Sequence, residues 1–204
     1  LLAEAIGGLR RQSIMWLLPE ALALQAWNAV GTGNWSGATA AAEQAAKLAS
    51  QLGRPLWEAA AKTALAATCA IHGDERVAES LLAEAEAIAV PRAASAVLAD
   101  TQFARALLAL SAGRHEEAFE HLQRTFDPHD PAHHHIRAAW RIGEFAEAAL
   151  HAGRIDEAGL VDECRECQRG GSGRHRDQRE EQDGREHARR QGEHARTTFW
   201  CPTC

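Results

Sequence analysis

The chain of 204 residues is 46% hydrophobic, contains 44 alanines and no tyrosine, and carries a net charge of −6 at neutral pH. No stretch approaches the roughly 20 uninterrupted apolar residues of a membrane-spanning helix, which excludes a membrane protein of that kind. Residues 1–160 hold 13 basic and 19 acidic side chains and no basic stripe that could neutralise phosphates, so we do not expect this chain to bind DNA directly.

The amino-terminal residues lack the features of a secretory signal. They carry Glu4, have no basic start, and are followed by no small-residue cleavage site. We therefore expect a cytoplasmic protein. The chain begins with Leu1 rather than Met, which indicates a fragment or a non-standard start codon.

Residues 1–160 are predicted to be helical throughout, because alanine has the highest helix propensity and no segment has the pattern of a strand. Leu1–Gln12 is expected to be the second helix of an incomplete pair. The pairs that follow are Leu18–Val30 with Ala38–Leu52, Leu56–Ile71 with Glu75–Ala89, and Ala93–Ala112 with Glu116–Phe126. A fourth pair consists of His135–Ala152 and a helix starting at Asp156. The sequence thus predicts an all-α protein.

Glycines recur every forty residues, at Gly33, Gly73, Gly113 and Gly153. Alanines stand seven residues before and five residues after each of them: Ala26 and Ala38, Ala66 and Ala78, Ala106 and Ala118, Ala146 and Ala158. A further small residue stands four before each glycine: Ala29, Cys69, Ala109 and Ala149. Self-similarity of this kind is typical of helical solenoids, in which each helix pair stacks on the next. Residues 1–160 are therefore interpreted as a repeat array with a period of 40 residues.

Each repeating glycine is placed where a helix ends, since glycine readily adopts the left-handed conformation that closes a helix. The residues that follow suit the start of the next helix. Asn34 and Asp74 are typical N-caps, and the acidic residues of the later units fall in a first turn, where the helix dipole favours them. Small residues on both sides of the turn let the two helices approach closely.

The order of small residue, turn glycine and small residue resembles the tetratricopeptide repeat, whose usual period is about 34 residues. This resemblance implies a tetratricopeptide-like α-α superhelix, a right-handed solenoid of helical hairpins. Residues 1 to about 158 more closely resemble part of the helical-repeat region of large ATP-binding LuxR-type transcriptional regulators, the group that includes the maltose-regulon activators. The likeness is carried by QAWNA at 25–29 with GNW at 33–35, GRHEEAFEHL at 113–122 and FDPHDPAH at 126–133.

The LuxR-type family implies an N-terminal signalling ATPase, a repeat region that senses an inducer or partner, and a C-terminal DNA-binding helix-turn-helix. No phosphate-binding loop of the GxxxxGK[ST] type occurs, and neither Lys47 nor Lys62 follows a glycine. No segment offers the basic recognition helix of a helix-turn-helix. We therefore assign neither function to these residues and expect no enzymatic activity and no cofactor.

Residues 161–204 have a different composition from the rest. From Asp162 to Thr198 there is no Val, Ile, Leu, Met, Phe, Trp or Tyr, so we expect this tail to be disordered. Such an abrupt change inside a repeat is typical of a shifted reading frame or of an inserted foreign sequence. A competing interpretation is a zinc site formed by two Cys-x-x-Cys pairs: Cys164 with Cys167, and Cys201 with Cys204. The 33 residues between the pairs argue against zinc, because an ordinary ribbon has about 15–20.

A histidine-rich segment separates the third and fourth pairs. His129, His133, His134 and His135 lie beside two aspartates and could bind a metal ion, but a solvated turn is the favoured interpretation. In that turn, Asp127 and Asp130 are expected to cap the chain around Pro128 and Pro131.

We expect a non-enzymatic module whose concave face binds a protein segment or a small-molecule inducer, as in the sensor region of a LuxR-type regulator. One alternative is a free-standing tetratricopeptide-like scaffold protein. The other is a zinc-binding protein that interacts with nucleic acid through the C-terminal cysteines.

Overall fold

The structure, a computed structural model, describes residues 1–157, and every regular element in that range is helical. The α-helices are α1 (Leu2–Arg11), α2 (Leu18–Gly31), α3 (Trp35–Gln51), α4 (Pro55–His72), α5 (Glu75–Ala89), α6 (Ser95–Ser111), α7 (His115–Phe126), α8 (His135–Trp140) and α9 (Ile142–Ala152). Two short 3₁₀ helices, η1 (Met15–Leu17) and η2 (Val90–Arg92), precede α2 and α6. The all-α class predicted from the sequence is thus confirmed for residues 1–157.

Some predicted features fall outside this range. The tail at 161–204 and Ala158 lie beyond the described residues, and of the helix expected from Asp156 only the first residues are described, in a turn. Among the described helices, none is both long and apolar enough to cross a bilayer.

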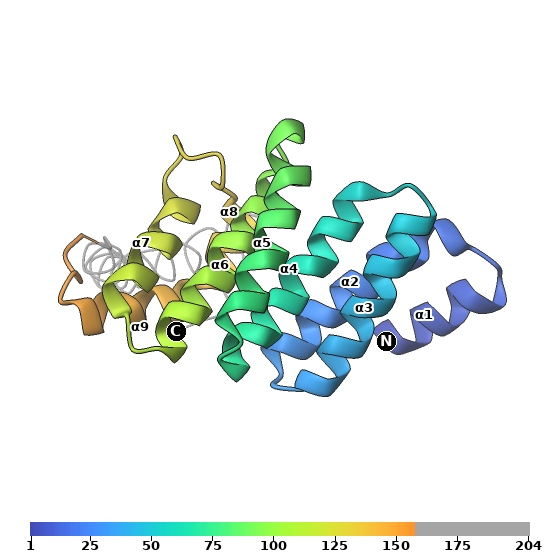
Figure 1. Ribbon diagram of the computed structural model, residues 1–204, viewed down its shortest axis with the longest axis horizontal. Coiled ribbons are helices and arrows are strands. Elements are labelled where there is room, and N and C mark those ends of the chain that lie inside the picture. Colours follow the sequence, from blue (N-terminus) through green and yellow to red (C-terminus); the bar gives the residue numbers. More distant parts are fainter. Residues whose placement is uncertain (158–204) are drawn as a thin grey trace, which may run out of the picture. The chain divides into compact units, whose positions relative to one another are not determined.

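Consecutive helices pack as pairs joined by short turns (Figure 1). The helices α2 and α3, α4 and α5, and α6 and α7 contact each other within their pairs. The first helices of the pairs also contact one another, since α4 packs on both α2 and α6. This row of α2, α4 and α6 forms one wall of the site described below.

The turns at the four repeating glycines share one geometry. Their φ angles are +71°, +80°, +71° and +71°, in the left-handed region that the sequence predicted. At each turn the backbone N–H of the residue after the glycine donates to the carbonyl of the small residue four before it, at 2.8–2.9 Å. The same bond closes α3 from Arg54 to Ala49 across Gly53, outside the forty-residue spacing. The turn geometry therefore goes with a glycine at the helix end and is not specific to the forty-residue spacing.

The predicted N-caps differ in their contacts. The side chain of Asn34 caps α3 by accepting a hydrogen bond from the Gly37 N–H at 3.1 Å, as expected. Asp74 occupies the N-cap of α5, but its side chain makes no capping hydrogen bond, so the predicted contact is wrong there. Glu75, Glu116 and Glu117 do lie in first helical turns.

The core is built largely from alanine. Six of the predicted repeat alanines have no exposed surface: Ala26, Ala66 and Ala106 on the first helices of the pairs, and Ala38, Ala78 and Ala118 on the second helices. Their small side chains let the helix backbones approach closely, and larger residues such as Leu22, Leu82 and Phe119 fill the remaining space. Ala146 departs from this pattern, because it is only half-buried while Ala148 and Ala149 are fully buried.

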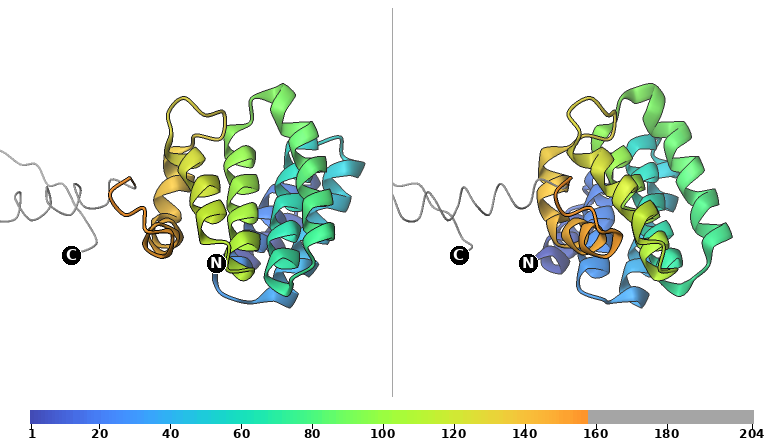
Figure 2. Two further views of the ribbon diagram at one scale, coloured as in Figure 1. Left: turned by 60° about the vertical axis from the view of Figure 1, so that its left-hand side comes forward. Right: turned by 90° about the vertical axis from the view of Figure 1, so that its left-hand side faces the viewer.

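The single helix predicted for residues 135–152 is in fact two helices. Arg141 separates α8 from α9 with φ −118° and ψ +14°. Its side chain is 4% exposed and donates to the Ala99 carbonyl at 3.2 Å and to the Asp100 carboxylate. At this break the chain changes direction, and α9 runs across α7 rather than continuing α8 (Figure 2). The changed direction explains why Ala146 does not occupy a contact position.

Candidate binding pocket

An open pocket with a volume of about 520 Å³ lies where α2, α4 and α6 meet the α8–α9 corner. Its volume falls within the roughly 300–1,000 Å³ typical of small-molecule sites. The lining residues are Leu24, Trp27, Asn28, Val30, Gly31, Trp35, Ile71, Phe103, Leu107, Arg137, Trp140, Arg141 and Glu144. The pocket thus combines apolar walls with a few polar side chains.

Four aromatic side chains form much of the wall. Trp27 and Phe103 pack with ring centroids 6.0 Å apart, while Trp35 and Trp140 contribute from α3 and α8. Trp140 is 66% exposed, which is unusual for so large an apolar side chain. The Trp27 Nε1 atom is buried and has no hydrogen-bond partner among the described residues, so no hydrogen bond from its N–H group holds this indole.

A buried ion cluster supports the wall from behind. Asp100 of α6 is 1% exposed, accepts a hydrogen bond from Arg141, and lies 3.4 Å from Arg137 Nε. Burial lowers the pKa of Arg141, and this effect outweighs the opposing effect of Asp100. One carboxylate therefore binds two guanidinium groups and fixes the corner of α8 and α9 to α6.

Both guanidinium groups lie over aromatic rings of the pocket. The Arg141 guanidinium carbon is 4.1 Å from the Phe103 ring centroid and 5.4 Å from that of Trp27. The Arg137 guanidinium carbon is 5.1 Å from the Trp140 ring centroid. These contacts have cation–π geometry and orient the rings as well as the charges.

Two charged side chains of the pocket, those of Arg137 and Glu144, can still form hydrogen bonds to a ligand. Within residues 1–157, the Arg137 side chain makes no hydrogen bond, and its ion pair with Asp100 is long, at 3.4 Å. Glu144 has neither a hydrogen bond nor an ion pair to any described residue, although it lines the same pocket. A cation and an anion thus face one cavity without bonding to each other.

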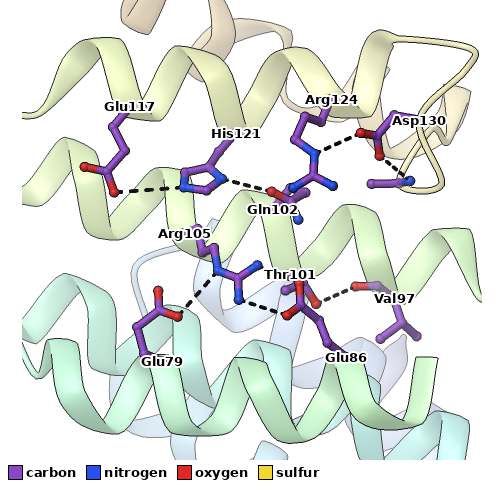
Figure 3. Close-up of polar contacts among 11 residues, drawn as sticks. Glu79, Glu86, Val97, Thr101, Gln102, Arg105, Glu117, His121, Arg124 and Asp130 are labelled. Carbon is purple, nitrogen blue, oxygen red and sulfur yellow. Dashed lines mark hydrogen bonds and ion pairs between the residues drawn. The ribbon is translucent and has the colours of Figure 1, made fainter. Parts of the chain in front are cut away.

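A second polar group joins α5, α6 and α7 (Figure 3). Arg105 donates two hydrogen bonds to Glu86, at 2.6 and 2.9 Å, and its Nε lies 3.5 Å from Glu79. The hydrogen bonds to Glu86 raise the pKa of Arg105, against the opposing effect of burial. This network links neighbouring helices with matched charges.

His121 belongs to the same network (Figure 3). Its Nδ1 lies 2.9 Å from Gln102 Oε1 and its Nε2 lies 3.9 Å from Glu117 Oε1. Burial and the nearby Arg105 cation lower the pKa of His121, which favours its neutral form. Each of these polar groups has a partner inside the network, so we interpret the network as a helix–helix contact.

The histidine-rich segment adopts a turn as expected. Asp127 accepts from the His129 N–H at 2.9 Å and Asp130 accepts from the Ala132 N–H at 2.7 Å, which confirms the predicted capping. His134 Nδ1 accepts from the Arg137 N–H at 3.3 Å and so caps α8, which carries two pocket residues. Burial, together with Arg137, lowers the pKa of His134.

Of the residues singled out from the sequence, only Trp27, Asn28 and Trp35, from the segments that carry the LuxR-type resemblance, line the pocket. No cluster of three or more His, Cys, Asp or Glu suited to a metal ion occurs within residues 1–157. The candidate zinc ligands Cys164, Cys167, Cys201 and Cys204 lie outside the described residues. None of the repeat residues lines the pocket; they build the helices that surround it.

Sequence reasoning missed the charged residues of the pocket and the cluster behind it. The sequence did contain one signal for this cluster: Asp100 is the only charged residue between positions 93 and 104. A lone acid in an apolar stretch requires a buried partner. The spacing of Arg137, Arg141 and Glu144 was compatible with one continuous helix, so it did not reveal the corner.

Comparison of the chain with protein-family models, with curated proteins and with solved structures gives no significant match.

Proposed function

We propose that residues 1–157 form a non-enzymatic helical-repeat module that binds a small molecule or a protein segment in the pocket between α2, α6 and the α8–α9 corner. The observation that carries this proposal is the pocket itself, where four aromatic side chains adjoin two charged groups with unused bonding capacity. Apolar walls with a few polar groups are the usual composition of ligand sites in proteins.

The proposal includes a tetratricopeptide-like right-handed superhelix as the scaffold. Two observations support it: α4 packs on both α2 and α6, and the repeat alanines of three pairs are fully buried. In such an array each helix pair contacts chiefly its neighbours, and the first helices line a common surface. The pocket lies on the side formed by these first helices.

A glycine in the pocket wall gives a direct test. Gly31 lines the pocket, and a Cβ atom added there would meet no atom within 4 Å, so Gly31→Trp is chosen to place an indole at the pocket wall. Gly8 of α1 is equally free of neighbours and lies outside the pocket, which makes Gly8→Trp the matched control.

The experiment is a thermal-shift screen of the full chain against small metabolites and short peptides. A ligand that binds only the folded state raises the melting temperature. We expect at least one compound that stabilises the native chain and Gly8→Trp but not Gly31→Trp. The proposal fails if no compound stabilises the chain, or if stabilisation persists in Gly31→Trp.

We further propose that the chain derives from the sensor region of a LuxR-type regulator, on the resemblance of residues 25–35, 113–122 and 126–133. Sequencing the gene through the codons for residues 158–204 and its flanks tests this origin. A phosphate-loop ATPase encoded upstream and a helix-turn-helix encoded downstream in a shifted frame support it. Absence of both rules it out.

A further inference from the structure

We infer that the pocket binds a free α-amino acid with a large apolar side chain. This inference rests on the proposed binding function and names its ligand. It is carried by the two groups that share the cavity without bonding to each other, Arg137 and Glu144.

The charges of the site favour a zwitterion. Arg137, Arg141, Asp100 and Glu144 carry two positive and two negative charges, which sum to zero. A ligand with a net charge would leave one of these groups unbalanced in a partly desolvated site, at a cost in binding free energy. An α-amino acid is neutral overall but carries both signs on one carbon.

The two signs match Arg137 and Glu144, whose side chains make no hydrogen bond within residues 1–157. The α-carboxylate can accept hydrogen bonds from the Arg137 guanidinium, and the α-ammonium can donate to the Glu144 carboxylate. Such charge-assisted bonds are roughly twice as strong as neutral ones. The interior of a peptide chain has no charges at its α-carbons, so a bound protein segment cannot offer both signs from one backbone carbon.

The apolar wall accommodates the side chain. Leu24, Val30 and Leu107 adjoin the indoles of Trp27, Trp35 and Trp140 in the same cavity. The Phe103 and Trp27 rings already lie beneath Arg141, and the Trp140 ring lies beneath Arg137. Occupied ring faces of this kind disfavour a purely cationic ligand held by cation–π contacts.

The test is calorimetric titration of the full chain with L-phenylalanine, L-leucine and L-tryptophan, and with three compounds that each lack one feature of phenylalanine. 3-Phenylpropionate lacks the ammonium group, 2-phenylethylamine lacks the carboxylate, and glycine lacks the apolar side chain. We expect at least one of the large amino acids to bind. For phenylalanine, each loss should weaken binding by about tenfold or more, the usual effect of losing a hydrogen bond to a charged group.

Two variants assign the contacts. Glu144→Gln should remove the preference for phenylalanine over 3-phenylpropionate, and Arg137→Gln should remove the preference over 2-phenylethylamine. The matched controls are Glu147→Gln on α9 and Arg76→Gln on α5, which are exposed and outside the pocket. Glu144 makes no bond within residues 1–157, so its variant reports on binding even if Arg137→Gln destabilises the corner. Unchanged preferences in a folded Glu144→Gln variant overturn the inference.

The pocket-filling variant separates the inference from the proposed function. If Gly31→Trp blocks some other compound while phenylalanine, leucine and tryptophan fail to bind at 10-mM concentrations, roughly the limit of weak specific affinity, the amino-acid inference is wrong and the binding module stands. If no compound of any kind binds, both are wrong. Amino-acid binding that survives in Gly31→Trp places the site elsewhere and also overturns the inference.

Discussion

Trp27 connects the helical core to the pocket, and its ring rather than its N–H group provides the contact. Because Nε1 has no partner among the described residues, Trp27→Phe removes an unsatisfied donor along with part of the ring. We expect Trp27→Phe to cost at most about 1 kcal/mol of unfolding free energy, and Trp27→Ala about 3 kcal/mol. Urea unfolding of both variants measures the difference, and equal losses would show that the N–H group matters.

His121 should make stability depend on pH. Its pKa in the folded protein is lowered from the ordinary value of 6.5 by burial and by Arg105, so the unfolded chain binds a proton more readily. The neutral His121 ring therefore contributes its full share of the unfolding free energy above about pH 6.5. This contribution is lost as the pH falls from 6.5 to the lower pKa of His121 in the folded state. Glu117 and Glu79 oppose this shift and Arg124 adds to it.

A variant isolates the contribution of His121 from those of the other histidines. His121→Gln removes the titrating ring, so the urea midpoint of the variant should fall less steeply than that of the native chain between pH 7 and pH 5, roughly the range in which histidines titrate. Parallel pH profiles for the two proteins would contradict the prediction.

At the scale of the element, the helix ends depend on backbone conformation. Gly113 closes α6 at φ +71°, where a Cβ atom is strained even though it would meet no other atom within 4 Å. We expect Gly113→Ala to destabilise the protein by about 1 kcal/mol. Gly8→Ala, inside α1 and also without close neighbours, should instead stabilise by about 0.5–1 kcal/mol. Opposite signs in thermal unfolding support this account, whereas a shared sign counts against it.

At the scale of residues 1–157, the Asp100–Arg141 pair links the α8–α9 corner to α6. Asp100→Leu leaves the Arg141 guanidinium buried without its carboxylate, which should cost about 3–5 kcal/mol. The double variant Asp100→Leu with Arg141→Met should recover most of that loss, because the two replacements are apolar and similar in length to the original side chains. Asp74→Asn is the control, since its side chain makes no capping bond.

A double-mutant cycle measured by urea unfolding gives the coupling between the two residues. Additive losses from the single variants would show that Asp100 and Arg141 do not act as a pair.

Sequence alone predicted the helices of the first three pairs, with their ends to within about three residues, but missed the corner. The glycines, the Asn34 cap and the alanine pattern are local signals, and each predicts a helix end or a close contact without reference to distant residues. The break at Arg141 has only a weak local signal, Gly143, and residues 135–152 are still compatible with one helix. The helix α8 ends at Arg141, the residue that contacts Asp100. These two residues are forty-one positions apart in the chain.

The amino-acid sequence by itself determined the all-α class, the first three helix pairs and most of the small contact residues, because helix propensity and glycine conformation act over a few residues. Only the tertiary structure decided the pocket. Its walls come from α2, α4, α6 and the α8–α9 corner, and its charged groups acquire their roles only when the Asp100 carboxylate meets two arginines from another part of the chain. Burial of a charge requires a partner, and the partner is set by packing rather than by spacing along the chain.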